Sequence, residues 1–133
     1  IMKKLVILLF SILISFNSFG DVVLYCQEEL NTGFISKNQK WSITKFNLLR
    51  YTIKFSNNYD ELIGFTEQNW NCLDSYDNKD FNSVVCIAPY QNGKSFTYDK
   101  NTKRFILVKG TTDGYIDQSS DTNNMSAGTC KKF

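Results

Sequence analysis

The chain carries four cysteines and no histidine, a combination that limits both its compartment and its chemistry. An even number of cysteines in a short exported chain is typical of a disulfide framework. More than one pairing is possible; we expect Cys26 to bond to Cys130, and Cys72 to bond to Cys86 within a local loop. A zinc site is the competing interpretation, but the chain has neither CxxC spacing nor histidine. We therefore expect no metal and no cofactor.

The first 20 residues have the parts of a secretory signal peptide. Two lysines stand near the start, and the run from Leu5 to Phe16 that follows is almost entirely apolar. Ser18 and Gly20 then place small side chains before a cleavage site that precedes Asp21. A membrane-spanning helix needs roughly 20 apolar residues, more than this run supplies. We expect residues 1–20 to be removed and the product to be periplasmic or secreted, soluble and free of the membrane.

The remaining residues, 21–133, are enough for one hydrophobic core and too few for two ordinary domains. The formal charge of +2 comes from the two lysines of the signal peptide, so this domain has equal numbers of basic and acidic side chains. A neutral domain lacks the excess of basic residues that displaces counterions from phosphates. We expect one domain, a monomer, with no nucleic-acid partner.

Short runs of aromatic and β-branched residues alternate along the domain with clusters of Asn, Asp, Gly and Ser, which is the pattern of an all-β protein. The clearest alternation places Tyr51, Ile53 and Phe55 on one face of a strand. Turn residues at 38–39 and 99–102 favour antiparallel hairpins. We predict a small antiparallel meander barrel, or a sandwich, of about eight strands. The expected strands are residues 22–27, 33–37, 41–46, 50–55, 61–66, 82–88, 94–98, 103–109 and 125–132.

The regions between these strands give two further predictions. Helical periodicity is weak throughout, so any helix must be short, near residues 47–49. The stretch 113–127 is rich in Ser, Asp, Thr and Asn and is predicted to be the longest polar loop. Long loops on rigid β scaffolds commonly carry function.

Candidate binding residues are aromatic side chains beside turns, which can stack on a sugar or anchor a partner, and acidic side chains in the long loop. The competing interpretations are core packing for the aromatic residues and turn formation for the aspartates. An oxygen-rich cluster at 74–80 lacks the Gly and Glu of a calcium-binding EF-hand loop. The candidates are Trp41, Trp70, Tyr115, Asp113, Asp117 and Asp121.

The residue set argues against an enzyme. With no histidine and with oxidised cysteines, only Ser or Thr beside Lys remains for nucleophilic catalysis, and no motif supports that arrangement. Carboxylates such as Asp74, Asp113 and Glu67 would serve a glycoside hydrolase only if they converged in a cleft. We name no catalytic residue.

Three motifs stand near the two ends of the domain: Val23-Leu24-Tyr25-Cys26, Thr32-Gly33-Phe34 and Gly128-Thr129-Cys130-Lys131-Lys132-Phe133. With these motifs the chain resembles a group of small exported proteins of marine bacteria and their phages. That group has no assigned activity, so the resemblance implies a fold and its disulfide but no reaction. A looser likeness is to periplasmic inhibitors of C-type lysozyme, which are small barrels with Tyr-x-Cys near the mature start. Here Tyr25 directly precedes Cys26, so the spacing differs.

These features predict a non-catalytic binding module stabilised by disulfides, whose partner is a protein, a glycan or a small apolar ligand. The alternatives are an exported structural or stress-related protein without a ligand, and a lysozyme-inhibitor-like protein. The state of the barrel interior separates two forms of the module. A lipocalin-like carrier requires an apolar cavity inside the barrel, whereas an inhibitor or adhesin requires a filled barrel.

Overall fold

A computed structural model describes residues 20–38, 40–65, 68–74, 82–89, 93–110 and 120–133. Nearly all of the expected signal peptide lies outside these ranges. The described residues form strands and no helix, so they include no helix that could cross a membrane. The strands are β1 (Val22–Lys37), β2 (Lys40–Lys45), β3 (Arg50–Phe55), β4 (Glu61–Ile63), β5 (Trp70–Asp74), β6 (Ser83–Ile87), β7 (Lys94–Asp99), β8 (Arg104–Lys109) and β9 (Ser120–Lys132).

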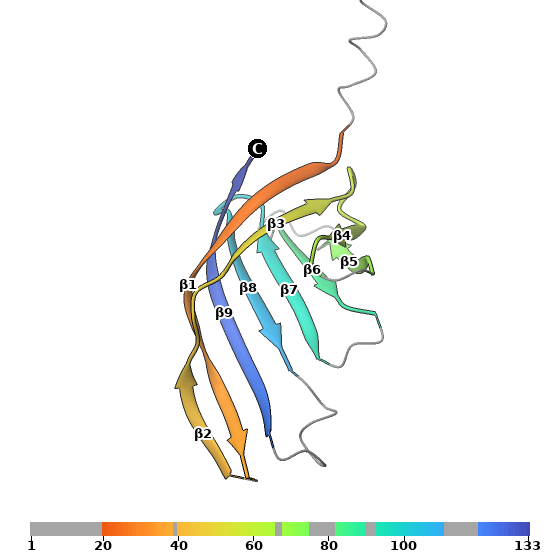
Figure 1. Cartoon of the computed structure of the whole chain (residues 1–133). Coiled ribbons are helices and arrows are strands. Elements are labelled where there is room, and N and C mark those ends of the chain that lie inside the picture. Colours follow the sequence, from red (N-terminus) through yellow and green to blue (C-terminus); the bar gives the residue numbers. More distant parts are fainter. Residues whose placement is uncertain (1–19, 39, 66–67, 75–81, 90–92, 111–119) are drawn as a thin grey trace, which may run out of the picture.

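The strands form one antiparallel sheet in the order β2-β1-β3-β4-β5-β6-β7-β8-β9, and β9 pairs back onto β1. The eight strands β1 and β3 to β9 therefore close a barrel, which confirms the predicted fold class. β2 stands outside this ring and pairs with β1. It lies beside the far ends of β1 and β9, which extend beyond β7 and β8 (Figure 1). We call this projecting β2-β1-β9 sheet the extension.

β1 is a single 16-residue strand, where the sequence predicted two. Its first part, Val22 to Gln27, pairs with β3, and its last part, Thr32 to Lys37, pairs with β2. β9 pairs with β1 along nearly its whole length, and the register shifts between Glu28 and Leu30. The residues in the middle of β1 are polar, so the sequence gives no strand signal there. They are in a strand because they pair with β9, which is nearly a hundred residues away in sequence.

Three other expectations about local structure are wrong. Residues 47–49 are an irregular connection between β2 and β3 rather than a helix. β5 was not predicted, and β9 begins at Ser120, so the expected loop 113–127 is a strand over 120–127. Residues 111–119 lie outside the described residues. The polar start of β9 is a strand because it pairs with β1. Local strand propensity cannot predict a pairing between segments so distant in sequence.

Both predicted disulfides are confirmed. Cys26 lies directly opposite Cys130 across β1 and β9, so this bond locks the first strand to the last and secures barrel closure. Cys72 lies opposite Cys86 across β5 and β6. Disulfides persist in oxidising surroundings, so the pair of bonds indicates an oxidising compartment.

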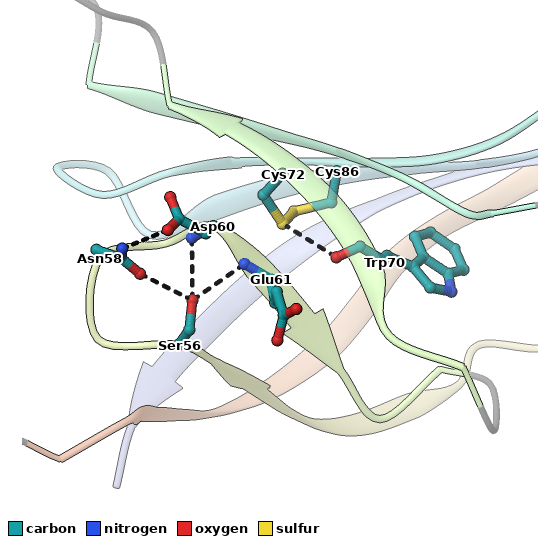
Figure 2. The surroundings of a disulfide bond; sticks show 7 residues. All are labelled: Ser56, Asn58, Asp60, Glu61, Trp70, Cys72 and Cys86. Carbon is teal, nitrogen blue, oxygen red and sulfur yellow. Dashed lines mark hydrogen bonds between the residues drawn. A yellow bond between two sulfur atoms is a disulfide. The ribbon is translucent and has the colours of Figure 1, made fainter.

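The Cys72–Cys86 bond lies beside the turn from β3 to β4 (Figure 2). In this turn the Ser56 hydroxyl oxygen accepts hydrogen bonds from the N–H groups of Asp60 and Glu61, each at 3.0 Å. The N–H of Cys72 donates to the carbonyl of Asp60 at 2.7 Å. β4 has only three residues and so forms short ladders with its neighbours. The turn and the disulfide therefore stabilise the part of the barrel with the shortest strand pairing.

Aromatic rings fill the barrel. Phe55 and Tyr98 stack at 5.7 Å between ring centroids, and Phe96 and Phe105 stack at 5.3 Å. Trp70 is buried, and its ring centroid lies 5.2 Å from that of Phe65. Trp70 is therefore a core residue, which agrees with the competing interpretation of core packing, since its strand directs the indole into the barrel. This packing favours the filled barrel over a lipocalin-like apolar cavity.

Candidate functional site

The register of the extension fixes which side chains share its outer face, because residues directly opposite each other in an antiparallel pair point the same way. Phe34 of β1 lies opposite Ile43 of β2, and Ser36 lies opposite Trp41. Thr32 lies opposite Met125 of β9. The next residue of β9, Ser126, is buried opposite Leu107 in the barrel, so Met125 points outward.

Four large apolar side chains thus gather on one face, and we call them the outer patch: Phe34, Trp41, Ile43 and Met125. Their exposed fractions are 50% for Phe34, 39% for Trp41, 79% for Ile43 and 52% for Met125. Single exposed apolar residues are ordinary, whereas a group of this kind on one face is a candidate interaction surface. Neighbouring Ile106 of β8 is also exposed on this side, which widens the patch toward the barrel.

An open groove of about 480 Å³ continues the outer patch along the barrel wall. Ile106 and Ala127 supply its apolar lining, and Glu29 and Arg104 supply charged groups. Ala127 is two residues from Met125 on β9 and therefore shares its face. The outer surface consequently offers a partner both exposed apolar side chains and a recess.

The segment that builds β2 and its surroundings is strongly basic. From Leu30 to Tyr59 the sequence contains five basic residues and no acidic residue, although the domain as a whole is neutral. Lys37, Lys40 and Lys45 lie on the β1-β2 hairpin and are exposed. Lys45 lies on the same face as the outer patch, and Lys37 and Lys40 lie on the other face of the hairpin.

The predicted binding residues do not form one site. Trp41 belongs to the outer patch and Trp70 to the core. Tyr115, Asp113 and Asp117 lie outside the described residues, while the backbone of Asp121 lies in β9 opposite Ser36. Residues 67 and 75–80 also fall outside, so the proposed carboxylate and calcium clusters are untested. Trp41 was a candidate because it lies beside a turn, but only the strand register shows that Phe34 and Ile43 share its face and that Met125 lies farther along the same face.

A second cluster, inside the barrel, was missed by the sequence reasoning. The carboxylate of Glu28 is fully buried and accepts three hydrogen bonds. They come from the Tyr51 hydroxyl at 2.5 Å, the Leu49 N–H at 2.9 Å and the Asn31 side-chain amide at 3.0 Å. Asn124 in turn donates to the Asn31 side chain at 2.8 Å. No sequence motif marks Glu28, because its partners come from distant strands and a connection.

The hydrogen bonds keep Glu28 ionised despite its burial. Burial by itself raises the pKa of the Glu28 carboxyl, but the bonds from Tyr51, Leu49 and Asn31, with the nearby Ser126 hydroxyl, outweigh it and lower the pKa below the usual value. Burial and the adjacent carboxylate raise the pKa of the Tyr51 phenol. The Lys109 ammonium lies 3.5 Å from the Tyr51 hydroxyl and extends the cluster toward the surface.

The geometry around Glu28 gives its carboxylate a structural role. Its carboxylate is enclosed by donors at the place where β1 leaves β3 for β2, and it fixes the connection before β3 through Leu49. The adjacent pocket, bordered by Tyr51, Phe65 and Lys109, measures about 210 Å³, which is below the common range for small-molecule sites. Among the described residues, no three His, Cys, Asp or Glu side chains are placed to hold a metal.

Comparison with known proteins adds no functional template. No family model, no curated protein and no solved structure matches this chain. The functional argument therefore depends on the surface, charge and packing of the chain itself.

Proposed function

We propose that the chain is an exported, non-catalytic binding module that holds a protein partner on its outer patch. One observation carries the proposal: Phe34, Trp41, Ile43 and Met125 lie together on one exposed face of a sheet that projects from the barrel. Export is supported by the N-terminal segment and by the two disulfides.

The composition of the outer patch suits protein recognition. Aromatic residues and methionine are enriched at the centres of protein interfaces, and tryptophan is a frequent hot spot. The extension holds these side chains on a three-stranded sheet rather than on a loop. The partner would therefore meet a largely preformed surface, which lowers the entropy cost of binding.

The barrel interior favours the same conclusion. The rings of Phe55, Phe96 and Tyr98 occupy the space that a lipocalin-like carrier would leave for its ligand. The buried Glu28 carboxylate is surrounded by donors within the fold. A partner held on the outside is consistent with both features.

The proposal is tested by photo-crosslinking in the cell that exports the protein. A photoreactive amino acid is placed at Ile43 in the patch and, as the control, at Leu73, which is 71% exposed on β5 of the barrel wall. We expect a specific protein adduct from position 43 that excess unlabelled wild-type protein competes away. The partner is then purified so that its affinity can be measured.

The affinity measurement uses Trp41→Ser and Ile43→Thr, with Leu73→Thr as the control. Each patch substitution should weaken binding by roughly tenfold or more, as expected for hot-spot residues, and should leave the melting temperature nearly unchanged. Equal crosslinking from positions 43 and 73, or unchanged affinity in the patch variants, would contradict the proposed function.

A further inference from the structure

We infer, building on the proposed function, that the partner adds an extended strand to the free edge of β2. The strand has apolar residues at alternate positions and acidic residues at its ends. Strand addition of this kind combines main-chain hydrogen bonds, which provide affinity, with alternate side-chain contacts, which provide specificity.

The backbone of β2 is oriented to accept such a strand. Among the strands that the structure describes, β2 is the end strand of the sheet and pairs with β1 on one side. The N–H of Phe46 donates to the carbonyl of Asn31 at 3.0 Å, which fixes the phase of the ladder. Hydrogen-bonded pairs alternate in an antiparallel ladder, so Thr44 and Ser42 turn their backbone groups toward β1. The N–H and C=O groups of Ile43 and Lys45 consequently face the free edge.

The side chains along β2 define the pattern of the added strand. Trp41 and Ile43 point to the outer face, whereas Ser42 and Thr44 point to the inner face. A strand laid along this edge places every second side chain beside the two apolar residues. The alternate side chains meet the hydroxyl groups of Ser42 and Thr44. Apolar and polar residues should therefore alternate in the partner.

The lysines at the two ends of β2 favour acidic residues at the two ends of the added strand. Lys40 begins β2 and Lys45 ends it, and Lys37 lies opposite Lys40 on β1. Lysines at an edge are a common protection against unwanted strand pairing. A second copy of this chain would bring another set of the same lysines to the same edge, which disfavours a homodimer. An acidic strand instead gains two opposite-charge contacts.

The positions of these lysines also argue against an anionic membrane as the occupant. Phe34, Trp41 and Ile43 share the outer face with Lys45, which lies opposite Thr32, whereas Lys37 and Lys40 lie on the opposite face of the same hairpin. A flat lipid surface that meets the outer face contacts Lys45 but cannot also contact Lys37 and Lys40. A strand at the edge reaches both faces, because its side chains alternate between them.

The test is a selection of displayed random peptides on the exported chain with both disulfides formed. We expect the enriched peptides to alternate apolar and polar residues between acidic ends. Synthetic copies of these peptides are then titrated against Lys45→Pro and Lys45→Ala. Both substitutions remove the charge, but only proline removes the edge N–H, a change that edge strands tolerate. Lys45→Pro should therefore weaken binding by roughly tenfold beyond Lys45→Ala.

The outcomes separate this inference from the proposed function. Peptides that lose affinity with Trp41→Ser but respond equally to Lys45→Pro and Lys45→Ala would overturn strand addition and leave the patch as the binding surface. Peptides that are indifferent to all of these variants, or no enrichment, would count against both. Sedimentation with phosphatidylglycerol vesicles that Ile43→Thr abolishes would replace the protein partner with a membrane. Thermal unfolding of each variant confirms that it is folded.

Discussion

The Tyr51 hydroxyl donates a hydrogen bond to the buried Glu28 carboxylate at 2.5 Å, at the place where β1 exchanges one neighbouring strand for another. At this exchange the backbone of β1 bonds to the connection before β3: the N–H of Glu28 donates to the carbonyl of Leu49, and the carbonyl of Asn31 accepts from the N–H of Phe46. The side chains of Glu28 and Asn31 hold the same connection, because they bind the N–H of Leu49 and the carbonyl of Asn47. The extension that carries the outer patch therefore depends on a polar cluster inside the barrel.

Glu28→Ala should destabilise the domain strongly. It leaves the Tyr51 hydroxyl, the Leu49 N–H and the Asn31 amide without their acceptor in the interior, a loss we expect to be about 3 kcal/mol or more in the free energy of unfolding. Tyr51→Phe removes one donor and should cost about 1–3 kcal/mol. Urea denaturation measures both.

The matched control is Glu29→Gln, because Glu29 is the exposed neighbour of Glu28 on the same strand. It should change the free energy of unfolding by no more than about 0.5 kcal/mol. If Glu28→Ala were as mild as Glu29→Gln, the cluster would have no structural role.

Stability should fall in acid because of Glu28. The folded state lowers the pKa of this carboxyl from its ordinary value of 4.5, so ionised Glu28 contributes stability above that pH. The contribution is lost as the pH falls below 4.5 and passes through the folded-state pKa. Urea midpoints measured from neutral pH into this range should decline less steeply for Glu28→Gln than for the wild type. Parallel profiles would show that Glu28 does not titrate as we expect.

Removing the two disulfides should have unequal effects. Cys26 and Cys130 are 104 residues apart in sequence, whereas Cys72 and Cys86 are 14 apart. In the chain-entropy account, removing the bond that closes the longer loop lowers the free energy of unfolding by about 4.7 kcal/mol, and removing the other lowers it by about 3 kcal/mol. Paired Cys→Ser variants compared by urea denaturation should rank in that order. The reverse order would mean that the Cys72–Cys86 bond, beside the turn in Figure 2, contributes more to stability than the Cys26–Cys130 bond.

Gly128→Ala should weaken the seam between β1 and β9. A Cβ atom at Gly128 would lie 1.9 Å from the carbonyl oxygen of Gln27, so the two backbones would have to separate. We expect a loss of more than about 2 kcal/mol in the free energy of unfolding. Gly110→Ala is the control, since its nearest backbone contact is 3.3 Å. Similar losses in both variants would contradict a specific close approach at Gly128.

Much of the barrel was predictable because its strands follow local rules. The alternation of Tyr51, Ile53 and Phe55 identified β3, and the expected bond between Cys26 and Cys130 joins the first strand to the last. The long pairing of β1 with β9 was not predictable from propensity. Its residues Ser120 to Asn124 are polar, and their strand conformation comes from a ladder with distant Gly33 to Lys37.

The site was harder to predict than the fold. Trp41 was a candidate as an aromatic residue beside a turn, yet only strand register places Phe34 of β1 on its face and Met125 of β9 farther along that face. Glu28 has no local signal either, since its donors belong to the connection before β3 and to β3 itself. Aromatic residues flanking turns looked alike in sequence, and burial alone separated Trp70 from Trp41.

Amide hydrogen exchange with a selected peptide bound tests the central claim, that partners bind at the extension, most directly. The account predicts that the exchange of the Ile43 and Lys45 amides slows by roughly tenfold or more, while the exposed Leu73 and Ile87 of the barrel wall keep their rates. Unchanged exchange across β2, with protection instead at Phe65 and Lys109 beside the barrel pocket, would contradict it.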